Sequence, residues 1–393
     1  MKLSALRRSD HQEIPSSELR FVVSPVLHRV LCSAILASAI LLMLPGAMSH
    51  SVTIVEFAQL PAGLLAWERG DLGVYRVCGP FSKLLYALPT YLAGVRIGTF
   101  DDLAMNGLAR WEWVLGRQFQ YNHINEYVEI YRWSRLLPIL MTALGGCLVL
   151  EWSTCLVGKR GGLISLCLWC WSPPILGHGS LVTSDMPAAV LTILAARCLW
   201  SFLLSPAWGA AALAGLTLGL AAGTKFTLLA LFPTWILLIL GQACSYRGRI
   251  PLEGPGRVAP FIRYWLFCLI IFIVAILAVD SLYLFQGIGC RLADIRKAGS
   301  SLASIVSELE GRPTTEWLTR VPLPIPRELL SGLAVQLADV EHAQSAFLFG
   351  STRAGGWWFW YLIAFLVKMP MPVLLLLGST IPLIKKVAKY DER

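Results

Sequence analysis

The chain has 393 residues, of which 56% are hydrophobic and only 15% are charged, and its mean hydropathy is +0.63. Soluble globular proteins average about 45–50% apolar and about 25% charged residues. The composition excludes an ordinary soluble enzyme, a disordered protein and a collagen-like fibre, and it predicts an integral membrane protein. The 10 cysteines lie mostly in apolar stretches and act as small hydrophobic residues rather than as a disulfide framework.

Apolar segments long enough to cross a bilayer recur along the chain. Each has about 16–27 residues, close to the ~20 that a helix needs to cross about 30 Å of hydrocarbon. The last segment contains Pro370 and Pro372, which predict a kink within a single crossing. We therefore predict an all-α membrane protein with about eight transmembrane helices, at 28–47, 135–156, 161–178, 184–204, 207–222, 226–243, 263–285 and 358–384.

Membrane orientation accounts for the net charge of +9. With the N-terminus inside, the cytoplasmic segments hold 15 basic and 6 acidic residues, a net charge of +9. The two long outer loops, 48–134 and 286–357, carry −1 and 0. This is the positive-inside pattern, and it leaves no basic patch for a nucleic acid. We predict a cytoplasmic arm at 1–27, a membrane domain at 28–384 and a cytoplasmic tail at 385–393.

The two outer loops are predicted to carry helices at the membrane surface. In the first loop, apolar residues recur at helical spacing between Phe57 and Trp67, and a second helical stretch starts at Pro80. In the second loop, residues 293–311 are compatible with a helix, 322–326 (PLPIP) are extended, and a further helix is expected over 327–340.

Most of the ionisable residues outside the cytoplasmic segments belong to the outer loops or to the outer ends of the helices. Examples are Glu56, Asp71, Arg135, Asp185, Lys225 and Arg353. This distribution predicts a cavity at the outer membrane face, roofed by the two loops. A transporter would be expected to show internal repeats and charges at the middle of the membrane. The sequence shows no convincing repeat, so a transporter is the least favoured alternative.

Four stretches of the sequence resemble one known family. EFAQLPAGLLAWERGDLGVYRVCGPFSKLLYALP, in the first outer loop, looks like that family's Asp-Glu loop, with Glu56, Gly63, Gly70, Asp71, Pro80 and Lys83 in register. The other stretches are SRLLPIL with GHGSLVTSDMPAAV, then LAAGTKFTLLALFP, and finally GGWWFWYLIAFLVKMPMP. In this order, over about residues 50–378, the chain resembles the polytopic C-type glycosyltransferases, in the branch of protein O-mannosyltransferases and lipid A aminoarabinose transferases.

The resemblance implies a C-type glycosyltransferase fold in a bacterial inner (plasma) membrane. It also implies transfer of a sugar from a polyprenyl-phosphate donor to a protein, lipid or glycan acceptor on the outer face, with inversion at the anomeric carbon. Such a reaction needs a general base, cations for the departing phosphate and an apolar groove for the lipid. No cofactor is obligatory. A divalent cation is compatible with the reaction, but no cluster with metal-ligand spacing indicates one.

Register with the family assigns the expected roles. The expected catalytic residues are Glu56, Asp185 and Asp71, with Glu56 as the general base. The expected substrate-binding residues are Arg135, Lys225, Lys368, Arg353, Lys83 and His342. Each also has a plainer interpretation: Glu56 and Asp185 could cap helices, and Lys225 could be an interfacial anchor. His178 is interpreted as a hydrogen-bonded structural histidine.

One departure from the family pattern concerns the first acid of the Asp-Glu pair. Val55 occupies that position and cannot accept a proton, so Glu56 remains alone. This leaves a second hypothesis open beside the enzyme: a catalytically degenerate homologue that acts as a membrane scaffold or a lipid-binding subunit.

Overall fold

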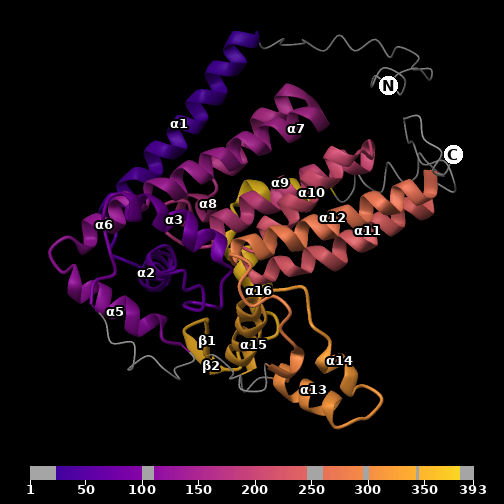
Figure 1. Ribbon diagram of the computed structural model, residues 1–393. Helices are drawn as coiled ribbons and strands as arrows, with labels where there is room; N and C mark the ends of the chain where they lie inside the picture. Colours follow the sequence, from indigo (N-terminus) through magenta and orange to yellow (C-terminus); the bar gives the residue numbers. More distant parts are fainter. Residues whose placement is uncertain (1–23, 100–109, 246–259, 295–300, 342–344, 381–393) are drawn as a thin grey trace.

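The computed structural model describes residues 24–99, 110–245, 260–294, 301–341 and 345–380, and these are predominantly helical (Figure 1). Among the described residues, five helices are long and apolar enough to cross a membrane, and a bent pair of helices is a sixth candidate. The fold is therefore that of a helical membrane protein, as the composition predicted. The count of eight crossings stays a prediction.

The long apolar helices form a bundle. They are α1 (Pro25–Ser49), α7 (Leu136–Cys170), α9 (Asp185–Leu204), α11 (Leu231–Ser245), which follows the 3₁₀ helix η2 (Phe226–Ala230), and α12 (Pro260–Leu282). The shorter apolar helix α10 (Trp208–Ala222) packs against α9 and α12. A Cβ on Gly215 or Gly219 would lie 2.4 Å from a carbonyl oxygen of α12, so these glycines allow the two backbones to approach closely.

Helix α7 is a hairpin of two arms. Its path breaks at Gly158, which has a φ of +80° and a ψ of 177°. Trp169 Nε1 donates a hydrogen bond of 3.0 Å to the carbonyl of Thr142, and Leu166 lies against Gly146, so the two arms run antiparallel. The break falls between the two helices that the sequence predicted at 135–156 and 161–178. The short helix α8 (Pro173–His178) follows the second arm.

The helices of both long loops lie at one end of the bundle (Figure 1). The first set comprises α2 (Ile54–Arg69), α3 (Pro80–Leu92), α5 (Glu112–Asn122) and α6 (Tyr127–Ser134), and the second comprises α13 (Ser301–Glu310), α14 (Glu316–Arg320) and α15 (Arg327–Glu341). An ion pair joins Arg110 to Asp339, and a Cβ on Gly332 would meet the carbonyl of Arg76 at 2.1 Å. The two segments therefore pack on each other.

The segment before the last helices differs from the all-α prediction. Strands β1 (Ser345–Leu348) and β2 (Ser351–Ala354) form an antiparallel hairpin. After it, α16 (Trp360–Lys368) is followed by a helix at Met371–Thr380, and the two are bent by 111°. The bend at Met369 and Pro370 confirms the kink that the prolines predicted.

Candidate functional site

Three chemically active side chains meet where the long apolar helices reach the helices of the first long loop. Asp185 is the first residue of α9, His178 is the last residue of α8, and Lys225 directly precedes η2. Lys225 Nζ lies 2.6 Å from Asp185 Oδ1, and His178 Nδ1 lies 3.3 Å from Asp185 Oδ2. The side chains of Asp185 and Lys225 are 37% exposed and that of His178 is 52% exposed. A carboxylate, an ammonium and an imidazole are thus accessible at one place.

Close backbone contacts hold Lys225 in position. The turn between α10 and η2 contains Gly223, whose carbonyl accepts a hydrogen bond of 3.0 Å from the backbone N–H of Phe81 in α3. A Cβ on Gly79 would lie only 2.1 Å from the same carbonyl oxygen. The first long loop therefore docks on the turn that carries Lys225, and only a glycine fits at position 79.

A cavity of about 580 Å³ borders the cluster. Its walls come from α8 and from the bend after α16, and they include His178, Leu181, Val367 and Lys368. Lys368 is the last residue of α16 and is exposed at the bend. The sequence placed Lys368 within the last predicted crossing, and it lines the same cavity as His178. Figure 1 shows α16 beside the bundle.

Asp185 controls the charge of the histidine. The hydrogen bond and the negative charge of Asp185 raise the pKa of His178, while burial and the positive charges of Lys368 and Lys225 oppose this effect. Three charged side chains, Asp185, Lys225 and Lys368, therefore act on one imidazole. Its protonation state is therefore sensitive to any further charge that enters the cavity.

Glu56 and Arg135 form a separate, fully buried ion pair. Both side chains are 0% exposed. Arg135 Nε lies 2.8 Å from Glu56 Oε1, and Arg135 Nη2 lies 2.7 Å from Oε2. Arg135 also donates to the carbonyls of Ala47, His50 and Ser51. The pair joins α2 and the start of α7 to the C-terminal end of α1. The hydrogen bonds of the guanidinium are thus made to groups of the protein.

The carboxylate oxygens of Glu56 also accept hydrogen bonds from other groups. It accepts hydrogen bonds from the backbone N–H and hydroxyl of Thr53, which begins α2, and from the backbone N–H of Val182 at 3.0 Å. Burial disfavours the charged form, but these hydrogen bonds and Arg135 outweigh it and lower the pKa of Glu56. Glu56 thus fixes the loop that leads to Asp185. Its geometry does not favour the predicted role of general base.

Asp71 and Lys83 also make contacts within the protein. Asp71 accepts a hydrogen bond of 2.8 Å from the backbone N–H of Gly73. Lys83 is 1% exposed and donates to the carbonyls of Leu72 and Val74, at 3.1 and 2.7 Å. Burial lowers the pKa of Lys83 to about 8. Both residues thus stabilise the loop between α2 and α3.

The other two predicted binding residues are not part of the cluster in the described structure. Arg353 is exposed on β2, opposite Ala346. Across the described ranges, no contact joins it to Asp185 or Lys225. His342 lies outside the described residues.

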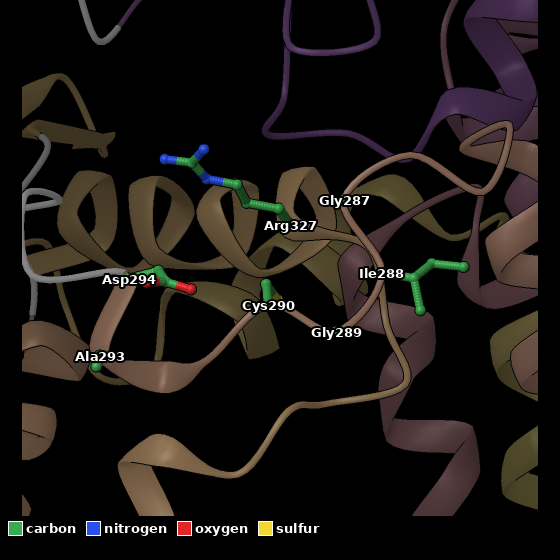
Figure 2. A pocket seen from close by; sticks show the side chains of 7 residues that line it. All are labelled: Gly287, Ile288, Gly289, Cys290, Ala293, Asp294 and Arg327. Carbon is green, nitrogen blue, oxygen red and sulfur yellow. The ribbon is translucent and has the colours of Figure 1, made fainter.

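A second hollow of about 550 Å³ lies where α15 begins and is lined by Gly287, Ile288, Gly289, Cys290, Ala293, Asp294 and Arg327. Figure 2 shows that the side chain of Arg327 points away from Asp294 and Cys290. No set of polar side chains converges there, so we do not consider this hollow a candidate site.

His178 lines the cavity, which the sequence did not predict. The sequence predicted a hydrogen-bonded histidine, and His178 does contact Asp185. A signal was present, because His178 and Asp185 flank the same predicted outer loop and are seven residues apart.

Among the residues that the structure describes, no group of three or more His, Cys, Asp or Glu side chains could hold a metal ion. Comparisons of the chain with protein-family models, with curated proteins and with solved structures gave no match.

Proposed function

We propose that the protein is a membrane glycosyltransferase that moves a sugar from a polyprenyl-phosphate donor to an acceptor hydroxyl or amine, with inversion. The observation that supports this proposal best is the cluster of His178, Asp185 and Lys225 beside a cavity that Lys368 also lines. The cluster lies where membrane helices emerge, which is the depth at which a lipid phosphate resides. The family resemblance of the surrounding motifs supports the same reaction class.

Lys225 and Lys368 are proposed to hold the donor phosphate. Two ammonium groups near one phosphate would stabilise the negative charge that grows on it as the bond to the sugar breaks. Lys225 already balances Asp185, so an arriving phosphate would share it. We leave Arg135 and Lys83 out of this role, because both are buried and their hydrogen bonds go to protein groups.

The proposed base is the pair of His178 and Asp185 rather than Glu56. In neutral His178, a proton on Nδ1 would be donated to Asp185, and Nε2 would be left to accept a proton. The acceptor oxygen or nitrogen would lose its proton to Nε2 as it bonds to the anomeric carbon. The bond from that carbon to the phosphate oxygen breaks at the same time, and polyprenyl phosphate leaves.

A catalytically degenerate homologue remains the second candidate function. It is favoured by Val55 at the place of the family acid and by the complete use of Glu56 in the pair with Arg135. Such a protein would bind the lipid donor and transfer nothing.

The test uses the purified full chain in lipid nanodiscs with a panel of radiolabelled polyprenyl-phosphate sugars. Donor retention and sugar transfer are measured separately. His178→Asn should lower transfer by about 10²–10⁴-fold, as expected for loss of a general base. Lys225→Met should weaken use of the donor by about tenfold or more. Lys159→Ala, a change of a basic residue next to the Gly158 break in α7, is the matched control and should have no effect.

Three outcomes are informative. Transfer that depends on His178 and Lys225 supports the enzyme. Retention of a donor without transfer supports the degenerate homologue. If no donor is retained or used, the proposed substrate class is wrong.

A further inference from the structure

Two neighbouring hollows lie on the first extramembrane segment, away from the residues of the Asp185 cluster. The first has a volume of about 260 Å³ and lies between the end of α3 and α6, where Pro89, Ile130 and Trp133 give it a mainly apolar lining. The second has a volume of about 360 Å³ and a polar lining that includes Arg96, Asn122 and His123. The two hollows share Ala93, Val95 and Glu126. An apolar hollow beside a polar one matches the shape of an amphiphile.

The position of the apolar hollow relative to the membrane helices follows from two contacts. Trp133 and Ser134 line it and come just before Arg135, the N-cap residue of α7. Arg132, in the same turn of α6, donates a hydrogen bond of 2.8 Å to the carbonyl of Met48 at the end of α1. The hollow is therefore level with the ends of two apolar helices, which is the depth of the lipid headgroups. Trp133 is 65% exposed, as is typical of an interfacial aromatic.

The charges around the two hollows have both signs and are held in place. Glu126 contacts His123 Nδ1 at 2.7 Å, and His123 Nε2 lies 2.6 Å from the carbonyl of Arg96. The guanidinium of Arg96 lies over the ring of Tyr91, 4.2 Å from its centroid. Glu126 and Glu129 both line the apolar hollow and are 62% and 52% exposed. Glu129 also contacts Arg132 at 3.0 Å, and Arg96 Nη1 donates to the carbonyls of Tyr91 and Val95. Unlike the buried Arg135 and Lys83, however, Arg96 is exposed, so its guanidinium and the two exposed carboxylates complement a zwitterion.

We propose that these hollows bind one phospholipid whose phosphate is esterified to an amino alcohol with a primary amine. The glycerol end and the upper part of one acyl chain occupy the apolar hollow. The phosphate faces Arg96 in the polar hollow, and the ammonium folds back to Glu126, which lines both hollows, and to Glu129 on the wall of the apolar one. A soluble aminoalkyl phosphate would lack the apolar part, and an anionic lipid without an amine would meet the carboxylates unfavourably. This site is independent of the proposed glycosyltransferase activity.

The experiment measures lipid bound to the purified full chain by native mass spectrometry. Phosphatidylethanolamine, phosphatidylcholine and phosphatidylglycerol with identical acyl chains are titrated separately, together with soluble glycerophosphoethanolamine. Phosphatidylethanolamine should bind at least about tenfold more tightly than the other three, since its ammonium donates charge-assisted hydrogen bonds. Equal binding of phosphatidylglycerol or phosphatidylcholine overturns the proposed headgroup recognition. Equal binding of glycerophosphoethanolamine overturns the role of the apolar hollow.

Two variants locate the site. Ala93→Trp fills the boundary between the hollows and should lower phosphatidylethanolamine binding by at least about tenfold, while Ala354→Trp on the exposed strand β2 is the control. The double variant Glu126→Gln with Glu129→Gln changes only exposed side chains and should remove the preference for ethanolamine over glycerol. If both variants bind and discriminate like the original protein, the lipid binds elsewhere and the proposal is wrong.

Discussion

The buried pair of Glu56 and Arg135 gives the sharpest prediction. Glu56→Gln keeps the shape of the side chain but replaces one acceptor oxygen by an NH₂ group. In the folded protein that group would face Arg135 in either orientation, together with the N–H of Val182 in place of Oε1 or the donors of Thr53 in place of Oε2. Removing one partner of a buried ion pair costs about 3–5 kcal/mol, because the other charge stays buried. We therefore expect the free energy of unfolding to fall by that amount.

The assay is thermal or denaturant unfolding of the purified protein in one detergent, followed by far-UV circular dichroism. Glu68→Gln is the matched control. Glu68 accepts one hydrogen bond of 2.7 Å from the backbone N–H of Ile97, and the amide oxygen of glutamine can still accept it. A loss of less than about 1 kcal/mol is expected there. Replacing both Glu56 and Arg135 by Met should cost less than the sum of the two single changes, because no charge is left without a partner.

The result that would refute this reasoning is a Glu56→Gln variant with unchanged stability and abolished sugar transfer. That outcome would mean that Glu56 acts on the acceptor, as its register with the family predicted. An unstable variant that retains transfer under permissive conditions would instead assign the residue to holding the loop before Asp185.

Three further predictions concern pH, packing and topology. Because contact with Asp185 raises the pKa of His178 in the folded state, this contact contributes stability below about pH 6.5 and loses it as the pH rises through the folded-state pKa. The stability difference between the original protein and His178→Asn should therefore shrink as the pH is raised above about 6.5 in unfolding experiments, and a constant difference would contradict the assignment. Gly79→Ala should destabilise the protein by more than about 1 kcal/mol, since its Cβ would lie 2.1 Å from a carbonyl oxygen, and an unchanged melting temperature would show that the turn can move away. Topology is tested with two single-cysteine variants, one that keeps only the exposed native Cys244 and one that has only Ser301→Cys. A membrane-impermeant maleimide added outside intact cells should label the second variant but not the first, and the reverse pattern would invert the topology.

The sequence predicted those features that depend on local pattern. The proline pair after Lys368 specified the bend, and the spacing of apolar residues specified the helices at 54–69 and 80–92. Asp185 and Lys225 were assigned to the outer ends of neighbouring helices, and the structure brings them into contact. The hairpin at 345–354 was missed because its turn, Phe349 and Gly350, lacks the Asn-Gly or Asp-Gly pattern that marks such turns.

Tertiary contacts over long sequence separations could not be predicted in this way. Glu56 and Arg135 were both expected at a substrate site, yet they bind each other across 79 positions. A single sequence contains no information about that pairing. His178 likewise acquires its role only from a contact with Asp185, which depends on how the loop between α8 and α9 folds back.

The length of α10 has a consequence for how deep the Asp185 cluster lies. Its 15 residues make a helix of about 22 Å, whereas the hydrocarbon layer is about 30 Å thick. The helix begins at the exposed Trp208 and ends three residues before Lys225. With Trp208 anchored at one interface, the end of α10 would lie about 8 Å short of the other, and the three residues that lead to Lys225 can span up to about 10 Å. Lys225 would then be level with the headgroups in a bilayer of ordinary thickness and below them in a thicker one, so bilayer thickness would set how far a polar reactant must descend to reach it.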